Sequence, residues 1–139
     1  MEKLIGHCDC GKLSYECTEE PINSVFCYCT CCQQRTNSDK WFGIWVKENG
    51  FSITKGESST FIRQGSSGKD MVHHFCSECG NTVAVYVEAG RFYTVSVATL
   101  ENSSDFSPNM AIYTASAAPW ATFPEGVPKY DTLPPSMGG

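Results

Sequence analysis

Short runs in which apolar and polar residues alternate, or in which apolar residues cluster, recur along most of the chain. Both patterns are typical of β-strands. We expect strands at 12–17, 41–46, 51–54, 59–63, 71–75, 82–87 and 92–97. Glycines around 65–68 and 89–91 predict two hairpin loops. Because no segment keeps a 3.6-residue apolar period over three turns, the pattern predicts an all-β or β-dominated fold built from antiparallel strands.

The segment from about residue 103 to residue 139 differs in composition from the rest. It holds six of the seven prolines but retains apolar residues such as Ile112, Trp120 and Phe123. This mixture predicts an extended C-terminal arm that packs on the body of the protein rather than a free linker. With no repeat and no boundary signal, we expect one domain over residues 1–139.

Composition and charge narrow the classes of protein to which the chain can belong. Hydrophobic residues make up 41% of the 139 residues, which favours a folded protein. A net charge of −5 with ten scattered basic residues argues against a nucleic-acid partner. No apolar stretch reaches the roughly 20 residues that span a bilayer, so no membrane partner is expected. The N-terminus lacks the apolar region of a signal peptide, and we therefore expect a cytoplasmic protein.

Eight of the nine cysteines lie in three groups, Cys8 and Cys10, Cys27 to Cys32, and Cys76 and Cys79. An odd cysteine count in a reducing compartment favours metal ligation over disulfides, and such spacing is typical of zinc. Gly80 after Cys79 is typical of a knuckle turn. A closed site needs two further thiolates, from Cys8 and Cys10 or from the middle group. Gly11 after Cys10 repeats the knuckle and favours the first choice, a four-thiolate structural zinc.

The middle group contributes three candidate ligands, Cys27, Cys29 and Cys32, on one short segment. Three protein ligands with an open position are the arrangement of catalytic zinc. The open position can take water or a substrate thiolate. The additional Cys31 has three interpretations: a bystander, a redox partner, or a fourth ligand that closes the site.

Other candidate residues have simpler interpretations. Cys17 ends a predicted strand and is expected in the core. On an alternating strand, one of His73 and His74 faces inward and the other outward, and neither is expected as a ligand. Trp41, Trp45 and Trp120 are candidates for a pocket wall, although their simplest interpretation is as core aromatics.

Taken in order, these motifs resemble the glutathione-dependent formaldehyde-activating enzyme family, which also includes the centromere protein V domain. The resemblance runs from about residue 6 to residue 130 and rests on residues 6–11, 27–32, 75–81, 118–120 and 124–130. It implies a β-tent, in which small twisted antiparallel sheets are stapled by zinc. It also implies a structural zinc on Cys8, Cys10, Cys76 and Cys79, and a catalytic zinc on Cys27, Cys29 and Cys32.

The activity implied by the resemblance is condensation of glutathione with formaldehyde to S-(hydroxymethyl)glutathione, which is classed with the carbon–sulfur lyases. The chain departs from the family pattern at several positions: Tyr28 and Cys31 replace His and Asp, Gln33-Gln34 a basic pair, Thr36-Asn37 a Ser-Gly pair, and Ala111 a tail histidine. In the family pattern, the basic pair would bind the carboxylates of glutathione, and this chain lacks that pair. Arg35 compensates in part.

We therefore expect a zinc-dependent enzyme of carbon–sulfur bond chemistry that acts on a small thiol adduct, with glutathione as a possible substrate. The alternative is a non-catalytic zinc module that binds a protein partner. A third hypothesis is redox or metal sensing through Cys31 and Cys32. The number of sulfur ligands at the second zinc discriminates between the first two.

Overall fold

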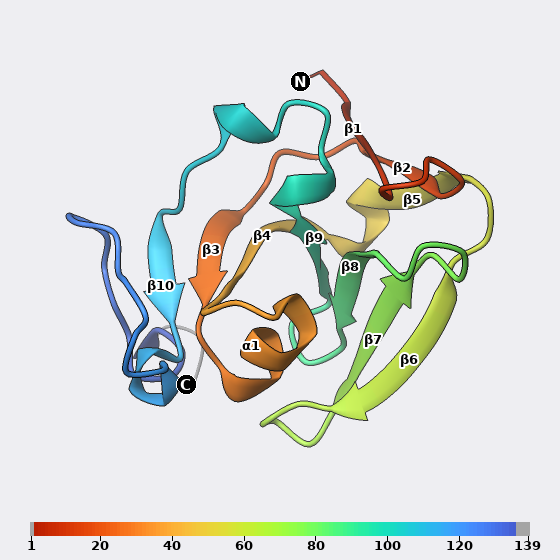
Figure 1. The fold of residues 1–139 in the computed structure, drawn as a ribbon. Coiled ribbons are helices and arrows are strands. Elements are labelled where there is room, and N and C mark those ends of the chain that lie inside the picture. Colours follow the sequence, from red (N-terminus) through yellow and green to blue (C-terminus); the bar gives the residue numbers. More distant parts are fainter. Residues whose placement is uncertain (1, 136–139) are drawn as a thin grey trace. The chain divides into compact units, whose positions relative to one another are not determined.

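Short β-strands make up most of the regular structure in the computed structural model, which describes residues 2–135 (Figure 1). The ten strands are β1 (Leu4–His7), β2 (Ser14–Cys17), β3 (Asn23–Cys27), β4 (Trp41–Lys47), β5 (Phe51–Lys55), β6 (Ser59–Gln64), β7 (Asp70–Phe75), β8 (Thr82–Val87), β9 (Phe92–Ser96) and β10 (Met110–Ile112). One short helix, α1 (Thr30–Thr36), follows β3. The prediction of a mainly β fold is confirmed.

The chain forms two compact units, each made of segments that are distant in sequence. The first unit contains the residues up to Ile22 together with Ile44–Phe106, and the second contains Asn23–Gly43 together with the segment from Ser107. The expected single domain with an extended arm stays a prediction. The C-terminal segment carries β10 and the 3-10 turn η4 (Thr114–Ser116), so its first part is not simply extended.

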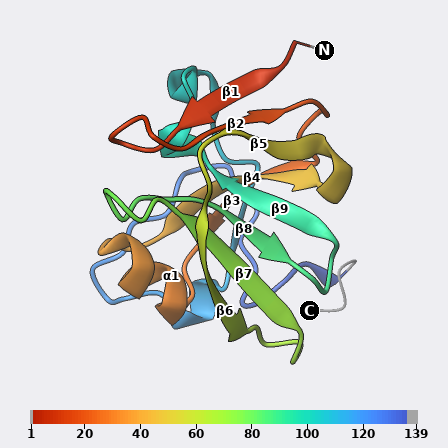
Figure 2. The same ribbon diagram turned by 90° about the vertical axis from the view of Figure 1, so that its right-hand side faces the viewer.

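The first unit is antiparallel. Strands β1, β2 and β5 form a three-stranded sheet in that order. In the second sheet, the neighbouring strands after β4 are β9, β8, β7 and β6, in that order (Figure 2). Both predicted hairpins are present: β6 pairs with β7 across the loop at 65–69, and β8 pairs with β9. All seven expected strands exist, with bounds that differ by at most a few residues. Strands β1, β3 and β10 were not predicted from the sequence.

Tyr15 is one of the largest fully buried side chains in the core of the first unit. Its side chain is fully buried, and its hydroxyl shares a 2.6 Å hydrogen bond with Oγ1 of Thr99. Its ring packs on Phe51 with 5.2 Å between centroids. Gly6 in β1 lies directly opposite Tyr15 in the register, and a Cβ at this glycine would collide with the Tyr15 ring and the Thr99 carbonyl. The glycine therefore lets β1 approach the phenol closely.

The second unit is built around a parallel strand pair. β10 pairs with β3 so that Ala111 lies opposite Phe26 and Ile112 opposite Cys27 (Figure 1). The outer side of β10 is covered by residues 128–132: Ala111 donates to the Pro128 carbonyl at 2.9 Å and accepts from Tyr130 at 2.9 Å. Ala111 is fully buried. This position, which was noted as a departure from the family pattern, is thus part of the core of the second unit.

Helix α1 was not expected from the apolar periodicity. It has only seven residues and no buried side chain, so its sequence cannot show a 3.6-residue apolar repeat. Its ends are set by polar contacts instead. The Cys29 sulfur caps the N-terminus by accepting from the Cys32 N–H, and Asn37 ends the helix in the left-handed region with φ +53°.

No helix within residues 2–135 combines the length and the apolarity that crossing a bilayer requires.

Replacement of Gly6 tests the packing of β1 on Tyr15. Gly6→Ala is expected to lower the free energy of unfolding by about 1–3 kcal/mol, because the new methyl group must displace a buried ring and a backbone carbonyl. Gly65→Ala is the matched control, since its methyl would meet the flexible Met71 thioether at 2.9 Å and the nearest backbone atom only at 3.8 Å. Urea denaturation of both variants measures the difference. Equal stabilities would contradict the proposed close approach.

Candidate metal centres

The structure brings Cys8, Cys10, Cys76 and Cys79 together, and we call them the four-cysteine cluster. Their sulfur atoms all lie within 4.8 Å of one another. Two of the separations are 3.6 Å, from Cys8 to Cys10, and 3.7 Å, from Cys10 to Cys76. Tetrahedral zinc with Zn–S bonds of about 2.3 Å requires sulfurs about 3.8 Å apart. The donor set and its spacing therefore fit such a metal ion.

Two similar turns carry the four sulfurs. In the first turn Gly11 donates to the Cys8 carbonyl at 3.0 Å, and in the second Gly80 donates to the Cys76 carbonyl at 2.7 Å. Both glycines have φ near +77° (Gly11 +78°, Gly80 +77°), a conformation that favours glycine. The Leu13 N–H also donates to the Cys8 sulfur at 3.3 Å. These turns confirm the knuckle geometry predicted from the two Cys-Gly pairs.

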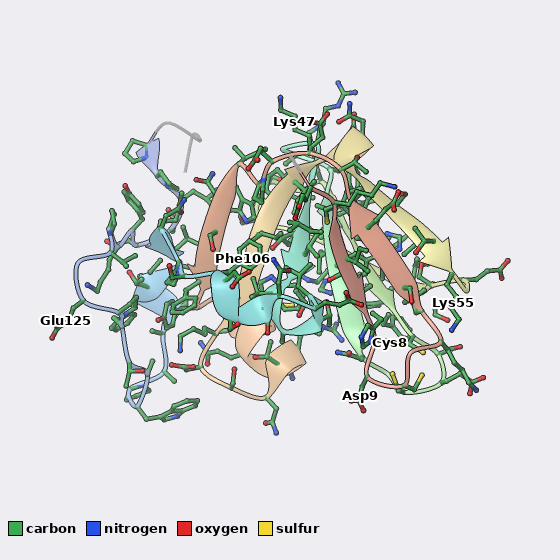
Figure 3. All side chains as sticks on the ribbon, turned by 90° about the horizontal axis from the view of Figure 1, so that it is seen from above. Cys8, Asp9, Lys47, Lys55, Phe106 and Glu125 are labelled. Atoms are coloured by element: carbon green, nitrogen blue, oxygen red, sulfur yellow. The ribbon has the colours of Figure 1, made fainter. Side chains whose placement is uncertain are left out.

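A direct hydrogen bond joins the two turns. The Asp9 N–H donates to Oδ1 of Asn81 at 3.0 Å, and Figure 3 shows Cys8 and Asp9 on the loop that follows β1. Cys8 and Cys76 are buried, whereas the second cysteine of each turn is exposed. The cluster therefore lies at the surface with one side against the protein. This placement suits a metal that holds two segments together.

The thiols of the four-cysteine cluster oppose one another's ionisation. Burial acts to raise the pKa of Cys8, but the Leu13 N–H and the neighbouring thiols lower it to about 6. The Lys12 N–H acts to lower the pKa of Cys10, but desolvation and the neighbouring thiols raise it to about 12. One thiol thus ionises at the expense of another. Full ionisation of the cluster requires a compensating cation.

The second unit contains a three-cysteine cluster, formed by Cys27, Cys29 and Cys32. Their sulfurs also lie within 4.8 Å of one another, and all three residues are partly buried. Cys27 is the last residue of β3, Cys29 is the N-cap of α1, and Cys32 lies in the first turn of the helix. The strand end, the loop and the helix start together turn three nearby residues toward one point.

The same electrostatic crowding is present in the three-cysteine cluster. Interaction with the Cys29 thiol raises the pKa of Cys27 to about 12. Interaction with Cys27 and then with Cys29 raises the pKa of Cys32 above its ordinary value. Because the thiols resist ionisation unless a cation is near, the chemistry of this donor set also fits a soft metal ion.

Cys31 lies on α1 next to Cys32 but is not part of the three-cysteine cluster. Successive residues of an α-helix point about 100° apart, so one of two adjacent side chains turns away from a common point. The geometry therefore does not favour Cys31 as the ligand that closes the cluster. A position remains for a further ligand if a metal with four-fold coordination binds here.

None of the three histidines belongs to a cysteine cluster among the described residues. His73 is buried, and its Nε2 accepts a 3.0 Å hydrogen bond from Nε of Arg63. His74 is partly buried and lies 2.9 Å from the Ser58 hydroxyl. His73 therefore faces inward, whereas His74 is only partly buried and does not face fully outward. Cys17 is fully buried in β2, as expected, and burial raises its pKa to about 12.

The three tryptophans differ in their surroundings. Trp45 is buried in the first unit and stacks on Phe92 with 4.5 Å between centroids, so it is a core aromatic. Trp41 is partly buried. Trp120, in the second unit, is 66% exposed, which contradicts its interpretation as a core residue.

Tyr28 and Gln33 were identified from sequence only as departures from a family pattern, yet both contact the loop of the three-cysteine cluster. Tyr28 separates two of the cysteines and is fully buried. The Gln33 side chain donates to the Tyr28 carbonyl at 2.9 Å. No periodic or spacing signal in the sequence reveals the further partners of these two side chains, Thr122 for Tyr28 and Ser116 for Gln33, because they lie in the C-terminal segment.

Comparisons with known proteins support the fold described above. The family model described as "Glutathione-dependent formaldehyde-activating enzyme" matches residues 3–116. A crystal structure of a Rhodobacter sphaeroides protein is similar with a TM-score of 0.58 and 20% identity, and the match covers 91% of this chain and 98% of that chain. At this identity the likeness shows the fold alone. No curated protein gives a significant match. Because the family model matches well over half of the sequence, the chain belongs to the glutathione-dependent formaldehyde-activating enzyme family.

Proposed function

We propose that the protein is a zinc-dependent enzyme of the carbon–sulfur lyase type that joins a small thiol to an aldehyde. The four-cysteine cluster holds a structural zinc. The three-cysteine cluster holds a second zinc at which the thiol binds. The observation that carries the proposal is that three sulfurs lie within 4.8 Å of one another while Cys31 is outside their cluster. Family membership supports the reaction class.

In the proposed reaction, a thiol adds to an aldehyde. The thiol sulfur forms a bond to the carbonyl carbon, the carbon–oxygen π bond breaks, and the thiol proton ends on the new hydroxyl, so that no redox partner is needed. When bound, zinc would supply a positive charge that lowers the pKa of the thiol. Glutathione and formaldehyde are the reactants that the family description suggests.

The residues of the chain have distinct roles in this proposal. Cys27, Cys29 and Cys32 bind the metal and leave one position for the thiol. Asp39 is not proposed as the proton acceptor, because its carboxylate contacts the Lys40 ammonium at 2.9 Å and accepts from the Thr122 N–H at 3.3 Å. Burial acts to raise the pKa of Asp39, but these hydrogen bonds hold it below the usual value. Its negative charge is therefore already compensated.

A non-catalytic zinc module that binds a protein partner is the second candidate. It is favoured by the side chain of Gln33, whose amide donates to two backbone carbonyls and is neutral where the family pattern has a basic residue. The Gln33 side chain therefore offers no positive charge to a carboxylate. In this candidate function, both metals only stabilise the fold.

Metal content and coordination distinguish these functions. We expect two zinc ions per chain by native mass spectrometry, and X-ray absorption should report four sulfurs at one zinc and three sulfurs with one lighter atom at the other. Cys29→Ser is expected to lose one zinc, whereas Cys31→Ser is the matched control and keeps both. Four sulfurs at both metals in the wild type would support the non-catalytic module and exclude the open position.

The reaction itself can be followed with glutathione and formaldehyde. Exchange NMR is expected to show that the wild-type protein accelerates formation of S-(hydroxymethyl)glutathione, and that Cys31→Ser retains this effect. Cys32→Ser should lose it, because the second metal is no longer held by three sulfurs. A wild-type rate equal to the spontaneous rate, with both metals bound, would rule out these two reactants as the substrates.

Removal of metal tests the role of the four-cysteine cluster. Chelation is expected to abolish the cooperative thermal unfolding transition, since crowded thiols gain no compensating charge and the binding energy of structural zinc is folding energy. Circular dichroism measures the transition before and after chelation, and readdition of zinc should restore it. An unchanged melting temperature in protein shown to be metal-free would contradict a structural zinc.

A further inference from the structure

We propose that Tyr28 and Gln33 are positioning residues that hold the loop of the three-cysteine cluster in its metal-binding conformation, with the C-terminal segment as their anchor. This inference rests on the proposed function, because it assumes that the cluster binds a metal. It goes further by assigning a role to two residues and to the part of the C-terminal segment that they contact.

Tyr28 fixes the loop through contacts with the C-terminal segment. Its side chain is fully buried, and its hydroxyl donates to the Thr122 carbonyl at 2.7 Å. Its ring packs on Phe123 with 4.7 Å between centroids, and the Lys40 ammonium lies 5.5 Å from the ring centroid. Because Tyr28 is the residue between Cys27 and Cys29, its anchorage restricts the backbone that directs both sulfurs.

Gln33 fixes the loop from the helix. Its Nε2 donates to the Tyr28 carbonyl and to the Ser116 carbonyl, each at 2.9 Å. Gln33 directly follows Cys32 in α1, so one amide group links the segment that carries Cys32 to the peptide between the other two cysteines. Both N–H donors of the amide are used. Loss of this side chain would leave two carbonyls without their partner.

The effect of these anchors is preorganisation. A loop that already holds its three sulfurs close together spends less free energy on ordering when the metal binds. Groups that orient metal ligands without touching the metal commonly change affinity by about 10- to 100-fold. Thr122 and Phe123 lie beyond the matched residues 3–116, so part of this anchor comes from a segment outside the family match.

The test uses two conservative variants, Tyr28→Phe and Gln33→Met, each of which keeps the size of the side chain and removes its hydrogen bonds. The controls are Tyr86→Phe, which removes a 2.6 Å phenol hydrogen bond to Glu48 in the first unit, and Gln34→Met at the exposed neighbouring position. Cobalt(II) titration of the full chain against a competing chelator measures affinity. The absorption bands separate a four-sulfur site from a three-sulfur site.

We expect each of the two variants to weaken cobalt binding at the three-sulfur site by about tenfold. Binding at the four-sulfur site should stay unchanged, which also shows that the protein is folded. Both controls should retain wild-type affinity at both sites. A variant that lowers the melting temperature but leaves the three-sulfur affinity within about twofold of wild type would overturn the inference, because the role would then be structural only.

The same titration separates this inference from the function on which it rests. If the wild-type chain binds cobalt only at the four-sulfur site, the proposed second metal is wrong, and the positioning roles fail with it. If the wild-type chain fills both sites and the variants bind as tightly as the controls, only the positioning roles are wrong.

Discussion

The close approach of four cysteine sulfurs is the constraint that ties two distant turns of the first unit together. Its two turns bring four sulfurs within 4.8 Å of one another across a sequence separation of 66 residues from Cys10 to Cys76. Closing so long a loop costs conformational entropy, and thiolates at this distance repel. The crowding is visible in the opposite displacement of the pKa of Cys8, to about 6, and of Cys10, to about 12. A cation bound by all four sulfurs would offset this repulsion and would hold β1 and β2 to the turn between β7 and β8.

The three-cysteine cluster has a different physical basis. Its members span only six residues, so bringing them together costs little loop entropy. A short flexible segment, however, has many conformations in which the sulfurs point apart. The shape of the loop therefore depends on contacts outside it: the parallel pairing of β3 with β10, the cap of α1, and the anchors at Tyr28 and Gln33. The four-cysteine cluster would need a bound cation to offset repulsion among its thiolates, whereas the three-cysteine cluster is shaped by the unit around it.

The positions that depart from the family pattern acquire a physical meaning in this fold. Ala111 is fully buried between β3 and residues 128–130, where a larger polar side chain would need both space and a partner. Tyr28 is fully buried, and the amide of Gln33 donates hydrogen bonds to two backbone carbonyls. In the proposed positioning role, Tyr28 and Gln33 stabilise the loop of the three-cysteine cluster in place of offering charge to a substrate. The substitutions thus change the surroundings of the cluster without removing any of its three sulfurs.

The sequence by itself determined the β-rich character of the fold, both hairpins, and which cysteines gather. These features are local: strand periodicity, turn glycines and Cys-Gly knuckles each act over a few residues, and the two φ values near +77° at Gly11 and Gly80 follow from them. The repeated Cys-Gly knuckle favoured the pairing of the outer cysteine groups, and the family resemblance implied the same pairing. Only the tertiary structure decided the rest. Helix α1 is capped by a cysteine sulfur rather than marked by apolar residues, β10 runs parallel to β3, and Trp120 is exposed. Tyr28 reaches a carbonyl 94 residues away. Such contacts join residues that are distant in the chain, and no periodicity or spacing within a short window can encode them.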